Sequence, residues 1–237
     1  MAIYAISDLH LSFSSEKPMD IYGGEWINHT EKIKNNWKAM ISEEDTVIIP
    51  GDTSWALRLN DAVVDLKWIS ELPGKKVLIK GNHDLWWNSV NKLNALFSNM
   101  FFLQNTFYAA EGYAICGTRG WICPGEDDFT SHDEKIYRRE LGRLKASLEA
   151  AVNAGYQRID NSGHSRMLGV LHFPPAGDIL RGSGFTELFE EYGVNKVIYG
   201  HLHGKDAIEG GFKGIRNGIE YILASTDHLR NIPIRII

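Results

Sequence analysis

Short hydrophobic runs recur along the chain, and each is rich in β-branched residues and bounded by glycine, proline or polar residues. Runs of this kind are typical of buried strands. Five of them lead into conspicuous polar residues, and they cover residues 2–6, 46–49, 76–79, 167–171 and 196–199. The pattern predicts further strands at residues 101–103, 107–108, 113–116, 219–224 and 232–237.

The segments between these runs carry apolar residues at helical spacing. They predict helices at residues 26–40, 61–71, 89–97, 134–154 and 185–192. In the longest, Leu141, Leu144 and Leu148 recur near the helical period, and Gly155 marks its end. Because strands outnumber the five polar-ended runs, the pattern favours an α/β sandwich of two sheets with helices outside over one doubly wound sheet.

Carboxylate, carboxamide and imidazole side chains follow the five polar-ended strands. In layered α/β proteins the carboxyl ends of the strands are where ligands collect. Side chains of these types together bind divalent metal ions. The residues in question are Asp8, His10, Asp52, Asn82, His83, Asp84, His172, His201 and His203.

Composition narrows the class of protein. The 237 residues are 43% hydrophobic and 23% charged, which suits one globular domain over 1–237. No apolar run reaches the roughly 20 residues of a membrane span. The chain begins in a strand-like run without a basic leader, and it has two cysteines, so we expect a cytoplasmic protein with reduced thiols. The net charge of -5 argues against binding to duplex nucleic acid.

The polar blocks together resemble the calcineurin-like metallophosphoesterase superfamily, whose pattern is D-x-H, G-D, G-N-H-D/E, a lone H and G-H-x-H. All five blocks occur in this order and extend to residue 203. They read Asp8-Leu9-His10, Gly51-Asp52, Gly81-Asn82-His83-Asp84, His172 and Gly200-His201-Leu202-His203.

The resemblance implies a four-layer αββα sandwich with a dinuclear metal site at one edge. It assigns the first ion to Asp8, His10, Asp52 and His203. It assigns the second ion to Asp52, Asn82, His172 and His201, with Asp52 as the bridge. It makes His83 a general acid or phosphate donor oriented by Asp84. The ligand set suits manganese, iron, zinc or nickel, and the absence of thiolates favours manganese or iron.

Two ions of this kind clamp the attacking and leaving oxygens of an in-line displacement. We therefore expect a hydrolase of small phosphomonoesters or phosphodiesters. The arginine that follows G-D in the protein serine/threonine phosphatases is missing from residues 51–55, which argues against that group. A nuclease or nucleotide phosphodiesterase using the same site, and a non-catalytic metal-binding scaffold, remain alternatives. Oligomeric state is left open.

Other residues near the blocks have two interpretations. Trp55, Trp86 and Trp87 could wall a pocket, although core packing is the preferred interpretation. Arg119 could reach a substrate phosphate, or it could form an ordinary surface ion pair. Part of residues 104–165 could form a cap over the site, and the loop at residues 12–26 is a second candidate wall.

Overall fold

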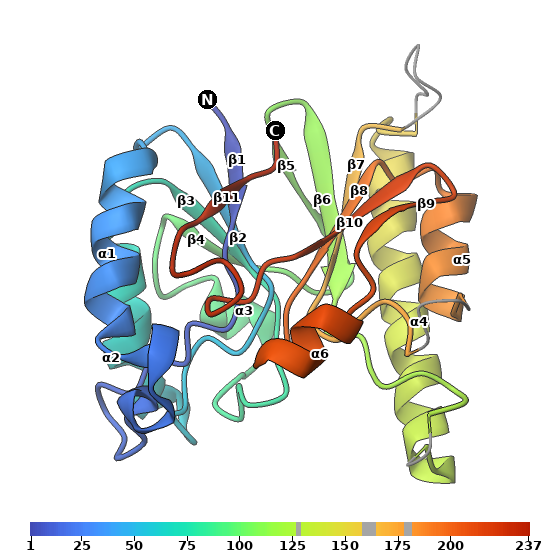
Figure 1. Cartoon of the computed structure of the whole chain (residues 1–237). Helices are drawn as coiled ribbons and strands as arrows, with labels where there is room; N and C mark the ends of the chain where they lie inside the picture. The colour runs from blue at the N-terminus through green and yellow to red at the C-terminus, as the bar shows by residue number, and fades with distance from the viewer. Residues whose placement is uncertain (127–128, 158–164, 178–181) are drawn as a thin grey trace.

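A computed structural model describes residues 1–126, 129–157, 165–177 and 182–237. It contains two mixed sheets (Figure 1). The first has the order β11-β1-β2-β3-β4, in which β1 to β4 run parallel and β11 runs antiparallel to β1. Its strands are β1 (Ile3–Ala5), β2 (Thr46–Ile49), β3 (Lys75–Leu78), β4 (Met100–Phe102) and β11 (Ile234–Arg235).

The second sheet has six strands in the order β5-β6-β7-β8-β10-β9. The four central strands are parallel, and the edge strands β5 and β9 are antiparallel to their neighbours. The strands are β5 (Phe107–Ala110), β6 (Tyr113–Thr118), β7 (Met167–Leu171), β8 (Lys196–Tyr199), β9 (Gly214–Arg216) and β10 (Ile219–Leu223).

Helices cover the outer face of each sheet, so the layers follow the expected αββα order (Figure 1). On the first sheet lie α1 (His29–Met40) and α2 (Leu59–Ser70), followed along the chain by the short α3 (Val90–Leu93). On the second lie α4 (Ser131–Asn153) and α5 (Gly184–Glu191). The short α6 (Lys205–Gly210) follows β8. The predicted fold class is therefore confirmed.

The central strands are apolar on both faces because both faces are buried. Val47 and Ile49 of β2 point into the core under α1 and α2, whereas Ile48 points into the core between the sheets. In the second sheet, Val197 faces α4 and α5, and its neighbour Ile198 faces the first sheet. This double burial explains why the sequence showed continuous apolar runs rather than alternation.

Some predicted boundaries were wrong for local reasons. The helix predicted at residues 26–40 begins only at His29, because Asn28 has a left-handed φ of 53° and Gly24–Trp26 forms a separate 3-10 turn. The helix predicted at 89–97 is reduced to α3. It ends at Asn94, whose side chain accepts from Phe102 N (2.7 Å) and is thereby tied to β4.

Most of the segment in which we expected a cap is part of the sandwich itself, since residues 104–165 contain β5, β6 and α4.

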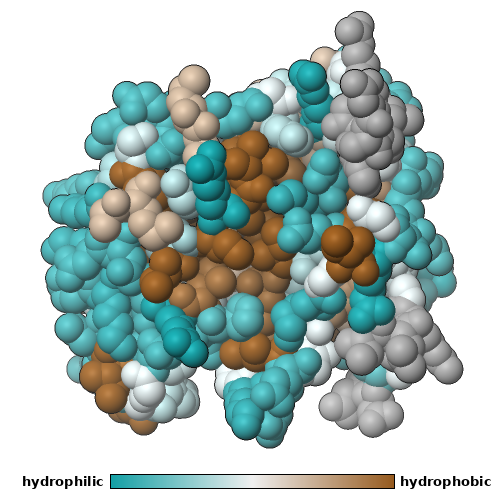
Figure 2. Space-filling model, turned by 45° about the horizontal axis from the view of Figure 1, so that its top comes forward, coloured by the Kyte–Doolittle hydropathy of each residue, from teal (hydrophilic) through white to brown (hydrophobic). Residues whose placement is uncertain are grey.

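No helix among the described residues combines the length and apolar character needed to cross a bilayer. On the face in Figure 2, hydrophobic residues gather at the centre within a hydrophilic surround. Partly buried hydrophobics such as Ile222, Ile234 and Ile237 border the core between the sheets.

Candidate metal centre

The backbone turns sharply where the predicted ligands leave their strands. Asp8, His10, Asp52 and His201 have φ values of 60°, 44°, 49° and 72°. Non-glycine residues seldom adopt this region, and backbone strain of this kind clusters at functional sites. Gly81 allows Asp52 to approach closely, because a Cβ at position 81 would collide with the Asp52 carboxylate and backbone nitrogen.

The first cluster of ligand atoms consists of Asp8, His10 and His203. His203 Nε2 lies 3.3 Å from His10 Nε2 and 3.4 Å from Asp8 Oδ1. Asp8 is fully buried and His10 is 3% exposed. Three ligand atoms thus converge on one point from the ends of β1 and β8.

The second cluster consists of Asp52, His172 and His201. Asn82 joins it, since its Oδ1 lies 2.6 Å from His172 Nε2 and 3.0 Å from His201 Nδ1. Asp52 Oδ2 lies 3.5 Å from His172 Nε2 and 3.9 Å from His10 Nε2. The Asp52 carboxylate therefore stands between the two clusters, as a bridging ligand would.

Neighbouring groups fix which nitrogen His172 and His203 present to the clusters. His172 Nδ1 lies 2.9 Å from the Pro50 carbonyl, which can only accept, so Nε2 is left free to face the cluster. His203 Nδ1 lies 2.9 Å from Asp227 Oδ1, and Asp227 also accepts from Gly204 N at 3.0 Å. The sequence analysis did not identify Asp227. Its signal was a polar residue shortly after β10, the same signal that marked the other strand ends.

The two carboxylates carry opposite pKa shifts. Burial, followed by the charge of Asp8, raises the pKa of Asp52 to about 8. Burial also acts to raise the pKa of Asp8. The hydrogen bond from His203 and the charges of the surrounding histidines outweigh burial, and the pKa of Asp8 falls below its usual range. With its pKa raised in this way, Asp52 becomes a carboxylate at neutral pH only beside a compensating positive charge.

Most of the surrounding imidazoles do not supply that charge. Burial is the largest cause that lowers the pKa of His10 and of His201, each to about 3, so both rings are neutral at pH 7. His203 is the exception. Burial lowers its pKa, but hydrogen bonds with Asp227 and Asp8 outweigh burial and raise it to about 10. Neutral imidazoles beside buried carboxylates form a donor set that fits divalent cations.

Comparison with known proteins agrees with this geometry. Residues 1–205 match the sequence profile of the calcineurin-like phosphoesterase family. The chain belongs to this family. The family is one of phosphoesterases, and its members use a dinuclear divalent metal site.

Individual relatives are more distant. The chain is 33% identical over 78 residues to the Gene 66 protein of Mycobacterium phage L5, a match that covers 33% of this chain and 37% of that protein. Phosphopantetheinyl hydrolase (PptH) from Mycobacterium tuberculosis has a TM-score of 0.54 at 14% identity, over 100% of this chain and 95% of that one. The protein of unknown function AQ665 from Aquifex aeolicus has a TM-score of 0.52 at 18% identity, over 99% and 95%. The two structural matches show a shared fold.

His83 stands at the mouth of the candidate centre. Its side chain is 44% exposed, and its Nε2 lies 4.0 Å from Asp52 Oδ2. Its backbone N–H donates to Asp52 Oδ1 at 2.8 Å, which fixes the loop that carries it. Burial and then the charge of His172 lower the pKa of His83. This position lets the ring reach a ligand bound to the clusters without belonging to either of them.

Asp84 does not orient His83 in the way the sequence analysis expected. Its fully buried carboxylate instead accepts hydrogen bonds from Thr53 N (2.9 Å), Ser54 N (3.2 Å), Gly81 N (2.7 Å) and Trp86 Nε1 (3.0 Å). The His83 ring is not one of these four donors, so it is not held by the Asp84 carboxylate in the described part of the chain. Asp84 therefore joins the loop after β2 to the loop after β3.

The three tryptophans do not share one role. Trp86 is 2% exposed, and both Trp86 and Trp87 pack against the core under the first sheet, as expected. Trp55 differs, because its ring stacks on the His10 ring at 4.7 Å and lines a cavity beside His83. Arg119 forms a buried ion pair rather than an exposed one: its guanidinium lies 3.7 Å from the buried Glu140 carboxylate and 4.4 Å from the centre of the Trp121 ring.

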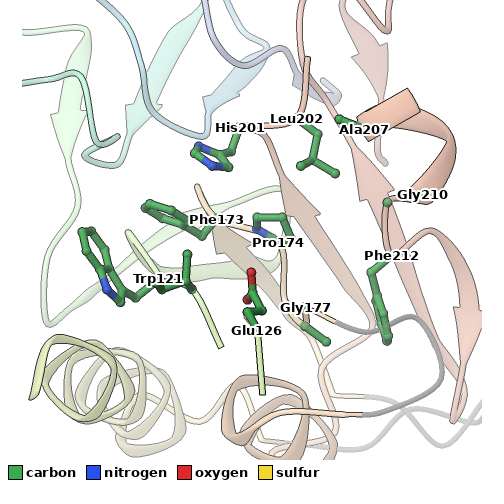
Figure 3. Close-up of a pocket in the computed structure, with 13 residues that line it drawn as sticks. Trp121, Glu126, Phe173, Pro174, Gly177, His201, Leu202, Ala207, Gly210 and Phe212 are labelled. Carbon is green, nitrogen blue, oxygen red and sulfur yellow. The ribbon is translucent and has the colours of Figure 1, made fainter. Parts of the chain in front are cut away.

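Two cavities border the centre. One of about 660 Å³ opens beside His10, His83 and His203. Another of about 280 Å³ lies on the far side of His201, where Phe173 packs on the His201 ring at 4.3 Å. In Figure 3, Glu126 points its carboxylate into this smaller cavity. Glu126 and Trp121 come from the segment in which we expected a cap, so a short part of it does reach the site.

Proposed function

We propose that the protein hydrolyses phosphate esters of a small molecule with two divalent ions. The first ion is held by Asp8, His10 and His203, the second by Asn82, His172 and His201, and Asp52 is shared between them. The observation that carries this proposal is the position of the Asp52 carboxylate, which belongs to the second cluster and whose Oδ2 also lies 3.9 Å from His10 Nε2 of the first.

When bound, the ions supply an activated water and polarise the phosphoryl oxygens. The remaining work falls to the protein. Asp52 would be shared by the two clusters, and its carboxylate would offset part of the positive charge of the ions. His83, exposed at the mouth, passes a proton to the leaving oxygen or donates a hydrogen bond to the phosphate. Asp84 holds the loops in place by pairing their backbone N–H groups.

Among manganese, iron, zinc and nickel, we favour manganese or iron for this site because no thiolate belongs to the ligand set. The ligands are carboxylate and carboxamide oxygens and imidazole nitrogens, which first-row divalent metals accept. Both cysteines, Cys116 and Cys123, are buried among hydrophobic residues of the second sheet, and burial raises their thiol pKa to about 12 and about 11. The thiols therefore stay protonated, and neither belongs to the clusters.

The test uses metal-reconstituted protein with p-nitrophenyl phosphate and bis-p-nitrophenyl phosphate, with Mn²⁺, Zn²⁺, Ni²⁺ or Mg²⁺. We expect metal-dependent turnover that falls to background in Asp52→Asn and by roughly 10²–10⁴-fold in His83→Ala. Asp206→Asn, an exposed carboxylate on α6, is the matched control and should retain full activity. The preferred ester separates a monoesterase from a diesterase. Full activity in both site variants would refute the proposal.

A further inference from the structure

The cavity of about 660 Å³ has a polar floor and largely apolar walls. Its floor includes three imidazoles of the proposed centre, from His10, His83 and His203. Its walls are mainly aromatic and aliphatic, from Met19, Tyr22, Trp26, Trp55 and Ile208, and the charged residues Glu25, Lys205 and Asp227 also line it. A volume of this size lies within the range of cavities that bind small organic ligands. The cavity is therefore larger than a phosphate group requires.

Two of the wall residues are fixed by the histidines themselves. The Trp55 ring stacks on His10 at 4.7 Å with an interplanar angle of 21°, and it lies 4.3 Å from the His83 ring. The Trp26 ring meets the His203 ring edge-on at 5.3 Å. Trp26 is 8% exposed, so most of its side chain is packed against other residues. An apolar surface thus begins directly beside the proposed metal ligands.

Tyr22 is the wall residue that lacks a partner ring. It is 68% exposed and ends the 3-10 turn Met19–Tyr22, and no other ring of the described residues packs on it. Gly23 and Gly24 follow with φ values of 68° and 56°, and they line the cavity without side chains. A large unpartnered aromatic ring beside an open apolar space is suited to packing against a flat ligand.

Two cations lie beside this cavity: Lys205 lines it and stands 4.0 Å from Glu209 Oε1, and Lys17 lies above the Trp55 ring. Lys17 Nζ stands 4.5 Å from the centre of the Trp55 ring. Lys17 has no acidic partner among the residues that the structure describes. Its charge is therefore available to an anion bound near His83, which favours an orientation with the phosphate on the polar floor and the organic group against the walls.

We propose that this cavity binds the alcohol portion of the substrate and that this portion carries a planar aromatic ring, packed against Tyr22. The inference rests on the proposed hydrolase function and adds a substrate class to it. An aryl alcohol and a nucleoside both provide such a ring, and the experiment distinguishes them.

The first test compares phenyl phosphate with hexafluoroisopropyl phosphate, because their leaving groups have similar acidity but only one is planar. Wild-type protein should favour the phenyl ester in kcat/KM by about tenfold. Tyr22→Ala should reduce this preference by about 3–10-fold, mainly through KM, since an aromatic contact is lost. The matched control is Ile21→Ala, which removes a 74% exposed neighbour outside the cavity lining and should keep the preference. Equal rates for both esters, or an unchanged preference in Tyr22→Ala, would overturn the proposal.

Adenosine 5′-monophosphate is the third substrate, because a ribose separates its ring from the ester. It is compared with ribose 5-phosphate, which has a similar leaving alkoxide but no planar ring. A preference for the nucleotide that Tyr22→Ala reduces assigns the ring to a nucleoside, and equal rates for these two esters assign it to an aryl alcohol.

The second test needs no metal. p-Nitrophenol should quench the tryptophan fluorescence of metal-free protein saturably, because Trp26 and Trp55 line the cavity, and at least threefold more weakly in Tyr22→Ala. Quenching that does not saturate would contradict the cavity assignment. Saturable quenching in a protein that hydrolyses none of the esters would instead refute the hydrolase proposal and leave the cavity assignment standing.

Discussion

Asp227 shows how one residue outside the family motifs controls a proposed ligand. Its carboxylate lies 2.9 Å from His203 Nδ1, and together with Asp8 it raises the pKa of His203. A carboxylate in this position fixes the ring and strengthens the opposite nitrogen as a ligand. We therefore expect Asp227→Asn to weaken metal binding by about 10–100-fold, measured by competitive metal titration. Asp206→Asn is the control, and equal affinities in wild type and Asp227→Asn would exclude this role.

At the scale of single residues, the sequence located those site residues that directly follow a strand and belong to a motif. Asp8, Asp52 and His172 could be found because strand ends converge at one edge of a sheet whatever the loops do. Asp227 and Trp55 could not be placed in the same way. Asp227 belongs to no motif, and the local sequence around Trp55 does not separate a cavity wall from a core residue such as Trp86.

At the scale of elements, Asp84 ties two loops together through buried hydrogen bonds. Asp84→Ala would leave the N–H groups of Thr53, Ser54 and Gly81 without their acceptor. We expect the free energy of unfolding to fall by about 2–4 kcal/mol in urea denaturation. His83→Ala removes the exposed neighbour and should change it by less than about 0.5 kcal/mol. Equal losses in the two variants would contradict the structural role of Asp84.

Because Lys76 of β3 is buried, we expect the free energy of unfolding to depend on pH through this residue. Its side chain is 1% exposed and donates to the Leu72 carbonyl beyond the end of α2, and burial lowers its pKa from 10.5 to about 8. Between pH 8 and 10.5 the unfolded chain therefore holds more protons on this group than the folded one, so its contribution to stability rises with pH. We expect a gain on the order of 1–2 kcal/mol between pH 7.5 and 10 relative to Lys76→Met.

Urea unfolding of both proteins at the two pH values measures this difference. Equal pH dependence in wild type and Lys76→Met would show that Lys76 does not titrate in this window.

The elements that the sequence predicted well are those held by two-sided burial. β2, β7 and β8 match their predicted ranges because their apolar residues supply both cores. The 3-10 turns before α1, the short α6 and the edge strand β9 were not predicted. They have few buried residues, so their conformation depends on tertiary contacts and backbone φ rather than on a periodic pattern.

At the scale of the whole molecule, the proposed centre spans both sheets. Asp8 and His10 follow β1, whereas His203 follows β8. In the second cluster, Asp52 follows β2 and His172 follows β7. Each ion would therefore connect the carboxyl ends of the two sheets.

This connection predicts that metal binding stabilises the fold as a unit. A ligand at 100 times its Kd stabilises the native state by about 2.7 kcal/mol, which for a chain of this size shifts Tm by roughly 5–10 °C. Chelation should lower Tm by this amount in a thermal scan, and added Mn²⁺ should restore it. In Asp52→Asn the response should largely disappear, because the residue shared by the clusters loses its charge. A full Tm response in that variant would mean that the ions bind without Asp52 and that the sheets are joined in some other way.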